Sequence, residues 1–266
     1  SYGARFNISV SRSTILDYPY DGAFENQSVS GYYNGKVLGE IWGYECAGIA
    51  NSKDQMNQWL ESNRPNWGSN WQAGDVMYRD LNGDGKVTSG ASTLKDHGDL
   101  KVIGNSNPRY RFGLNLNAGW KGIDFSVFFQ GVMKMDYLFG SDQAYFWGAQ
   151  GNMWQSAVFA EHLDYWRDEN SYGAERFGVN TNAYYPRPYF GGINKNHQAM
   201  DRYVQDASYI RCKNMQLGYS LPRNIIGKIG MTNCRIYVSC DNLFTCTKMS
   251  KVFDPEVLQG GWGAGK

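Results

Sequence analysis

The sequence lacks any long hydrophobic run and contains few cysteines and histidines. No stretch of about 18 consecutive apolar residues occurs, and the mean hydropathy of −0.55 is low, so membrane-spanning helices are excluded. The net charge is +1 and the basic residues are scattered, which gives no electrostatic footprint for nucleic acid. No nucleophile elbow, phosphate-binding loop or dinucleotide fingerprint is present, so we do not expect an enzyme.

The five cysteines cannot all pair, because their number is odd. Neither they nor the three histidines occur at the spacing of metal ligands. We interpret the cysteines as small apolar residues. They are Cys46, Cys212, Cys234, Cys240 and Cys246.

What the chain does contain is alternation of apolar and polar residues from Arg111 to Val132, on both sides of Lys121-Gly122. Apolar side chains share one face of each run: Phe112, Leu114, Leu116, Ala118 and Trp120, then Ile123, Phe125, Val127 and Phe129. Each run of roughly 10 residues, tilted by about 40°, would cover about 25 Å, the height of an outer-membrane apolar band. The pattern predicts a β-hairpin, either in a membrane barrel or in a soluble sandwich.

The alternation recurs near both ends of the chain. Phe6, Ile8 and Val10 form one apolar set, and residues 234–240 form another. Ser208 to Leu221 is strand-like but keeps no single phase, so we expect there either a β-bulge or a crossing of the strand from the lumen side to the bilayer side. With 15% aromatic residues and 32 glycines, the chain is predicted to be all-β.

A run beginning at Asp80 has the oxygen spacing of a calcium loop. Oxygen ligands fall at its first, third, fifth and seventh positions, the last through a backbone carbonyl: Asp80, Asn82, Asp84 and Lys86. Ala91 stands where an EF-hand needs glutamate, so Asp96 or Asp99 would have to complete the shell. The alternative is that Asn-Gly-Asp-Gly forms a pair of turns.

Between Met133 and Asp206 lies a segment of about seventy residues with little alternation. Periplasmic turns of barrels are short, so we expect this segment to be an extracellular loop. Its aromatic rings could contact a ligand, or they could pack within the loop or against a partner protein. The candidate ligand-binding residues are Trp147, Trp154, Trp166, Tyr165 and Tyr185. Before this loop, Met56, Trp59 and Leu60 at helical spacing predict a short helix within residues 51–64, the only one expected.

Several motifs keep the order found in one protein family. They are GDVMYRDLNGDG at 74–85, Pro108-Arg109-Tyr110, Phe128-Phe129-Gln130-Gly131, the segments 206–219 and 237–245, and Asp254-Pro255-Glu256. In these motifs the chain resembles the SusC/RagA family of TonB-dependent outer-membrane transporters. The resemblance implies that residues 1–266 are a fragment of the C-terminal part of a β-barrel of about 22 strands, with long extracellular loops. The plug domain and the last strand would lie outside the fragment.

The resemblance also implies a function in the outer membrane of a Gram-negative cell. Family members import oligosaccharides or peptides, and a SusD-like surface lipoprotein acts as a lid. Import is energised by TonB, which would contact the N-terminal part that is absent here. The other expected partners are the remaining barrel segments and the lipid bilayer, and no cofactor is required beyond the hypothetical calcium ion.

One other function class stays open beside transport, and an enzyme ranks behind both. A soluble, calcium-assisted carbohydrate-binding β module would also be aromatic and all-β, but a second sheet would cover its apolar faces. A glycosidase could use acids such as Asp164, Asp168 and Glu169, although nothing in the sequence fixes their separation.

Overall fold

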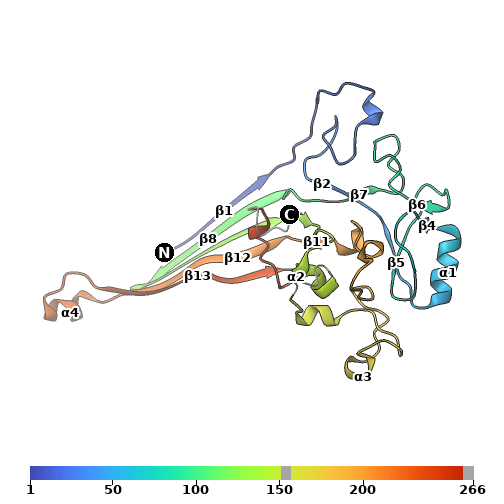
Figure 1. Cartoon of the computed structure of the whole chain (residues 1–266). Helices are drawn as coiled ribbons and strands as arrows, with labels where there is room; N and C mark the ends of the chain where they lie inside the picture. The colour runs from blue at the N-terminus through green and yellow to red at the C-terminus, as the bar shows by residue number, and fades with distance from the viewer. Residues whose placement is uncertain (151–156, 260–266) are drawn as a thin grey trace. The chain divides into compact units, whose positions relative to one another are not determined.

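The computed structural model describes residues 1–150 and 157–259, so Trp154 lies outside the described residues. The chain forms two compact units (Figure 1). The first, which we term the sheet unit, comprises Ser1–Arg12, Asn107–Asp136 and Asp206–Met249. The second, the loop unit, comprises Ser13–Ser106, Tyr137–Gln205 and Ser250–Lys266.

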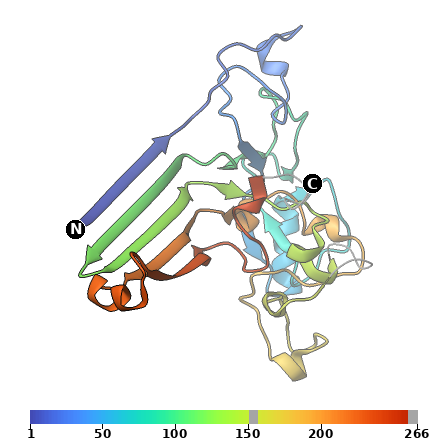
Figure 2. The same ribbon diagram turned by 90° about the vertical axis from the view of Figure 1, so that its left-hand side faces the viewer.

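The sheet unit is one antiparallel sheet of five strands. Their order is β1, β8, β9, β12, β13, and Figure 2 shows them side by side. Their bounds are β1 Tyr2–Val10, β8 Tyr110–Trp120, β9 Ile123–Met133, β12 Tyr209–Ser220 and β13 Arg235–Thr247. The predicted hairpin is present, and its turn has positive φ at both Lys121 (46°) and Gly122 (85°), as two-residue hairpin turns favour.

The strand register gathers apolar residues on one face of the sheet and polar residues on the other. One row across all five strands is Phe6, Leu114, Phe129, Cys212 and Phe244. The adjacent row, on the opposite face, is Asn7, Gly113, Gln130, Arg211 and Thr245. On the apolar face, Phe6 and Val238 are 60% and 68% exposed. Among the residues that the structure describes, no second sheet covers this apolar face, whereas the soluble module would require one.

A β-bulge in β12 explains why its sequence keeps no single phase. The register shifts between Cys212 and Asn214 against both neighbouring strands. Against β9, Lys213 is the extra residue, whereas on β13 the two residues Asn242 and Leu243 lie opposite Lys213. Even-numbered residues before the bulge and odd-numbered residues after it therefore share the apolar face. The bulge predicted within Ser208–Leu221 is confirmed.

The polar face carries a network of side-chain hydrogen bonds. Arg235 donates to both carboxylate oxygens of Asp124, at 3.0 and 2.5 Å, and to Gln216 at 3.1 Å. Further along the sheet, Asn214 donates to Asp241 at 2.7 Å. Such a face suits contact with water and other polar groups.

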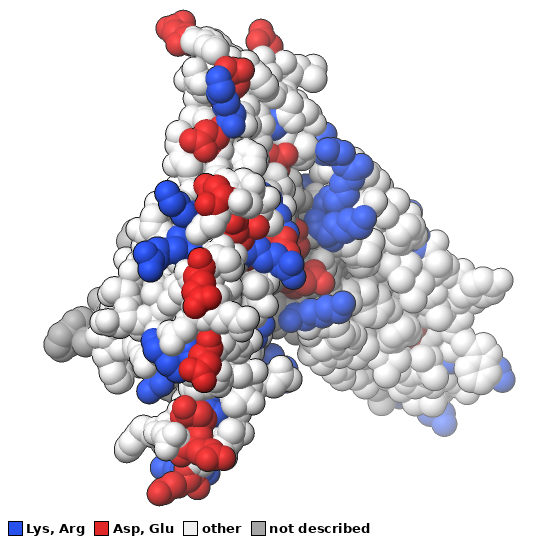
Figure 3. Space-filling model, turned by 90° about the vertical axis from the view of Figure 1, so that its right-hand side faces the viewer, with Lys and Arg blue, Asp and Glu red and all other residues white. Residues whose placement is uncertain are grey.

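The loop unit contains short strands paired as β2–β7, β3–β5 and β4–β6. The bounds of these strands are β2 Glu40–Gly43, β3 Cys46–Ile49, β4 Arg64–Pro65, β5 Val76–Tyr78, β6 Lys86–Val87 and β7 Lys101–Asn105. Two further strands, β10 (Asp136–Tyr137) and β11 (Gln205–Asp206), span the points where the chain passes between the units. On the face drawn in Figure 3, acidic and basic side chains are interspersed, so no large surface of one sign appears there.

The predicted helix is confirmed as α1 (Lys53–Ser62), whose N-cap Ser52 accepts a hydrogen bond from the Gln55 amide. Met56 is its fully buried residue. Four-residue helices, which the sequence analysis did not predict, are α2 (Ala144–Trp147), α3 (Ala174–Phe177) and α4 (Arg223–Ile226). The 3-10 helices are η1 Phe24–Asn26, η2 Gly148–Gln150, η3 Ala160–Leu163, η4 Ile193–Lys195, η5 Asp201–Tyr203, η6 Gly227–Ile229 and η7 Val257–Gln259. Among the described residues, no helix is long and apolar enough to cross a bilayer.

Candidate functional site

The aromatic residues predicted to bind ligand lie mostly inside the loop unit. Trp147, Trp166 and Tyr185 are buried, and Tyr165 is half-buried. The Trp147 ring stacks on His197, with 3.8 Å between ring centroids, and the Trp166 indole donates to Asn51 at 3.3 Å. In this structure three of the four described rings therefore pack in the core, which is the alternative that the sequence left open.

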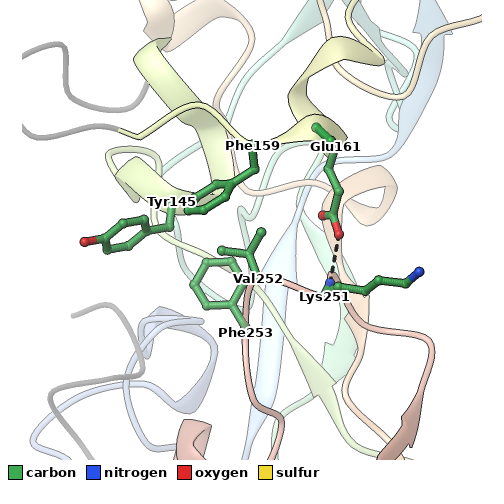
Figure 4. A pocket seen from close by; sticks show the side chains of 7 residues that line it. Tyr145, Phe159, Glu161, Lys251, Val252 and Phe253 are labelled. Carbon is green, nitrogen blue, oxygen red and sulfur yellow. Dashed lines mark hydrogen bonds between the residues drawn. The ribbon is translucent and has the colours of Figure 1, made fainter.

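The loop unit also contains an open pocket (Figure 4). Its volume of about 870 Å³ is within the range of small-molecule sites. Two chain segments about a hundred residues apart form its wall. The lining residues are Tyr145, Phe159, Ala160, Glu161, Lys251, Val252 and Phe253.

Ring contacts and one histidine hold the apolar side of this pocket. Phe253 packs against Phe139, with 4.1 Å between centroids. His162 accepts the Phe159 amide hydrogen at Nδ1 (3.0 Å), so its Nε2 carries the proton and donates to the Tyr145 carbonyl oxygen (3.1 Å). The imidazole of His162 thus fixes the backbone of both Phe159 and Tyr145. The Tyr145 side chain is 49% exposed and is available to a ligand.

The polar side of the pocket is organised by Glu161. Its carboxylate accepts hydrogen bonds from the Ser250 hydroxyl (2.6 Å) and the Lys251 amide (2.9 Å), which joins the two segments. Lys251 itself is exposed at the rim. Aromatic surface beside one ammonium and one fixed carboxylate can bind an amphipathic molecule.

The Asp80 loop has the shape of consecutive turns. Asp80 accepts from the amides of Gly83 (2.6 Å) and Gly85 (2.8 Å), and the side chain of Asn82 accepts from the Asp84 amide (3.0 Å). Burial opposes ionisation of Asp80, but these backbone hydrogen bonds hold its pKa below the usual range. In the described part of the chain, no group of three or more His, Cys, Asp or Glu is placed to hold a metal. The calcium site stays a prediction from sequence, while the turns are observed.

Asp99, one of the two acids predicted to complete the calcium shell, holds this loop together through hydrogen bonds to its backbone. It is fully buried and accepts from the amides of Leu81 (2.7 Å) and Thr88 (2.7 Å). Lys86, the remaining candidate, is exposed and donates its amide to Asp84 at 2.8 Å. Asp99 is thus the one member of the candidate metal set whose side chain is buried.

Replacing Asp99 with asparagine is expected to lower the free energy of unfolding of the loop unit by about 1–3 kcal/mol, because an amide NH₂ would then face a buried backbone N–H. Asp84→Asn is the matched control, since Asp84 is exposed, and its effect should stay below about 0.5 kcal/mol. Thermal denaturation of the two variants, with and without added calcium, measures both effects. Equal stabilities would contradict the buried role of Asp99.

A charged cluster lies deep in the loop unit. Lys195 donates to Asp75 at 2.7 Å, and both side chains are buried. Asn196 donates to the other Asp75 oxygen (2.9 Å) and accepts the Val76 amide (2.9 Å). Burial, together with the charge of Asp75, raises the pKa of Tyr189, whose ring lies 4.1 Å from the Lys195 ammonium. This cluster connects the Gly74-Asp75-Val76 motif to the segment around Lys195.

His197 makes the stability of the loop unit dependent on pH. Burial lowers its pKa from 6.5 to about 4, and its Nδ1–H donates to the Ser141 carbonyl oxygen at 2.8 Å. Between pH 6.5 and 4 the unfolded chain binds a proton that the folded chain does not, so the free energy of unfolding decreases as the pH is lowered through this window. The expected loss is about 3 kcal/mol. The difference between melting curves of the wild type and His197→Gln at pH 7 and pH 4.5 isolates this contribution, and parallel pH profiles would contradict it.

Comparison with known proteins shows which proteins this chain is similar to. No family model matches the chain. TonB-dependent receptor P3 of Formosa agariphila is 26% identical over 96% of the chain, and TonB-dependent receptor P26 of the same organism is 29% identical over 69%. These receptors are homologues of the chain. The predicted resemblance to TonB-dependent transporters of the SusC/RagA kind is thereby confirmed.

Solved structures of RagAB are similar to this chain in fold. The RagAB peptide transporter superposes with a TM-score of 0.61 at 18% identity, over 96% of this chain and 24% of the other. The RagAB peptide importer in the closed-closed state gives 0.61 at 20% identity. The chain spans 23% of the length of receptor P3 and 16% of receptor P26. The predominance of strands agrees with the predicted fold class, while the number of strands in a complete barrel stays a prediction.

Proposed function

We propose that this chain forms part of the wall and of the extracellular loops of a TonB-dependent nutrient importer in the outer membrane of a Gram-negative cell. The observation that carries the proposal is the five-stranded sheet, with an exposed apolar face for lipid and a hydrogen-bonded polar face for the lumen. Remaining strands of the same barrel would complete the wall. The homology to TonB-dependent receptors supports this assignment over an enzyme or a soluble module.

A pair of neighbouring residues on β13 tests the barrel wall. Cys240 stands opposite Met215 on the apolar face near the middle of the strand, and Ser239 stands opposite Gln216 on the polar face. In the full-length protein, Cys240→Arg should oppose membrane insertion by about 2–4 kcal/mol, whereas Ser239→Arg at the same depth should be tolerated. The yield of heat-modifiable, membrane-extracted protein measures both. Equal yields would contradict a lipid-facing apolar surface.

We propose further that the pocket around Tyr145 contacts the imported nutrient, an oligosaccharide or a peptide. The exposed ring of Tyr145 can stack on a sugar face or pack against a peptide side chain. RagAB, a peptide transporter, supports the peptide alternative. A SusD-like surface lipoprotein would cover the loops, and TonB would energise import through a segment outside this chain.

A matched pair of tyrosines tests the pocket. Tyr145→Ala in the full-length protein should lower retention of peptides from a casein digest, or of starch oligosaccharides, by about tenfold if one stacking contact is worth about 1.4 kcal/mol. Tyr172→Ala is the control, because Tyr172 is fully exposed and lies outside the pocket. Mass spectrometry of the retained molecules identifies the ligand class. Equal retention by the two variants would remove the pocket from the proposal without affecting the barrel wall.

A further inference from the structure

The connection between β12 and β13, residues 221–234, is much longer than the two-residue turn at the same end of the sheet. Its ends are closed by backbone hydrogen bonds, since Ser220 donates to Gly122 (2.8 Å) and Leu221 donates to Cys234 (2.9 Å). Between them the chain forms α4 and η6, which continue beyond the strand ends (Figures 1 and 2). Ile226 is buried at the centre of this connection, so the segment has a defined shape.

Apolar side chains cover the outside of this connection. Ile225 and Met231 are at least half exposed, and Ile229 is 68% exposed. At the same end of the sheet, the apolar face presents Trp120 and Ile236, both largely exposed. The exposed apolar surface of the sheet therefore continues onto residues 221–234. Large exposed apolar surfaces of this kind mark contact with lipid or another protein.

The charge of the connection has one sign. Residues 221–234 include Arg223 and Lys228 but no aspartate or glutamate. The neighbouring turn adds Lys121, whose ammonium lies 4.9 Å from the Trp120 ring. Asp124, the acid nearest this turn in the sequence, is paired with Arg235. Apolar side chains combined with uncompensated cations are the composition of a segment that lies in a lipid interface.

We propose that residues 221–234 sit in the phospholipid headgroup layer at the periplasmic face of the outer membrane. Ile225, Ile229 and Met231 enter the boundary of the acyl chains, and Arg223 and Lys228 contact the lipid phosphates. This inference rests on the proposed barrel, because only then does the apolar face border a bilayer. Charge complementarity selects anionic lipid over an apolar protein partner.

Photocrosslinking in the full-length protein tests this placement. p-Benzoylphenylalanine replaces Ile229 in protein reconstituted into nanodiscs of phosphatidylethanolamine and phosphatidylglycerol, and intact mass after irradiation detects lipid adducts. The same group at Leu217, which is exposed on the apolar face, is the positive control, and at Ser239 on the polar face it is the negative control. Heat-modifiable mobility establishes that each variant has assembled. We expect lipid adducts at positions 217 and 229 and none at 239.

The controls separate the two levels of the proposal. Adducts at 217 without adducts at 229, or protein adducts at 229, would overturn the interfacial placement and leave the barrel intact. No adducts at 217 would overturn the barrel itself. With Arg223→Gln and Lys228→Gln introduced together, the yield of phosphatidylglycerol adducts at 229 should fall about fivefold for each cation removed. An unchanged yield would overturn the role of the two cations.

Discussion

Replacing Lys195 with methionine is expected to lower the free energy of unfolding of the loop unit by about 3–5 kcal/mol, because it leaves the buried carboxylate of Asp75 without its cation. The side chain of Asp75 has no access to water, and Lys195 is also buried. The loss should be local. Hydrogen exchange measured on peptides around Asp75 and Val76 of the full-length protein would detect it as faster exchange.

Two further variants make this result specific. Lys95→Met breaks the ion pair with Glu25, in which both side chains are largely exposed, and should cost less than about 1 kcal/mol. Adding Asp75→Asn to Lys195→Met removes the unpaired charge while keeping an acceptor oxygen for the Gln72 amide, and should recover part of the loss. Equal effects of the Lys195 and Lys95 variants would contradict a buried ion pair at this position.

Trp166→Ala is expected to lower the free energy of unfolding of the loop unit by about 3–5 kcal/mol through loss of apolar contact and formation of a cavity. The indole packs closely on Gly74, where an added Cβ would lie 2.5 Å from the Trp166 ring. Gly74 also has φ of +89°, which disfavours other residues. Thermal denaturation measures the loss.

This measurement also decides between two roles for Trp166. If the Trp166 ring stacked on ligand at the surface, its removal would lower ligand binding and leave the free energy of unfolding unchanged. Tyr172→Ala is the aromatic control, and it should change the free energy of unfolding by less than about 0.5 kcal/mol because its ring is 100% exposed. Similar stabilities of the two variants would return Trp166 to the set of ligand-binding candidates.

The sheet unit could be predicted from sequence because its information is local. Alternation with a period of two marks β8 and β9, and the loss of phase in Ser208–Leu221 marks the bulge at Lys213. The pairing of β1 with β8 could not be predicted, because about a hundred residues separate the strands. The short helices were missed because four residues are too few to show a helical period.

The candidate site was only partly accessible to sequence reasoning. The aromatic rings of the long loop lie in the loop unit, but composition does not distinguish a core ring such as Trp166 from an exposed one such as Tyr145. Phe253 joins the pocket from the other end of the chain, through contacts that no local pattern encodes. A signal that could have directed attention to this region is the adjoining Asp254-Pro255-Glu256 motif, which the sequence analysis used only for the family resemblance.

The two long insertions that make up most of the loop unit leave and re-enter the sheet at adjacent backbone positions. Ser11 donates to the Arg109 carbonyl at 3.0 Å, and Ala207 donates to that of Met135 at 2.8 Å. Residues 13–106 and 137–205 therefore behave as inserted modules with closed ends, the arrangement that tolerates replacement. The buried Lys195–Asp75 ion pair and the packing of Trp166 on Gly74 join the two insertions, so they would have to be exchanged together. Under the proposed function, such an exchange would change nutrient recognition while the strand register of the sheet stays the same.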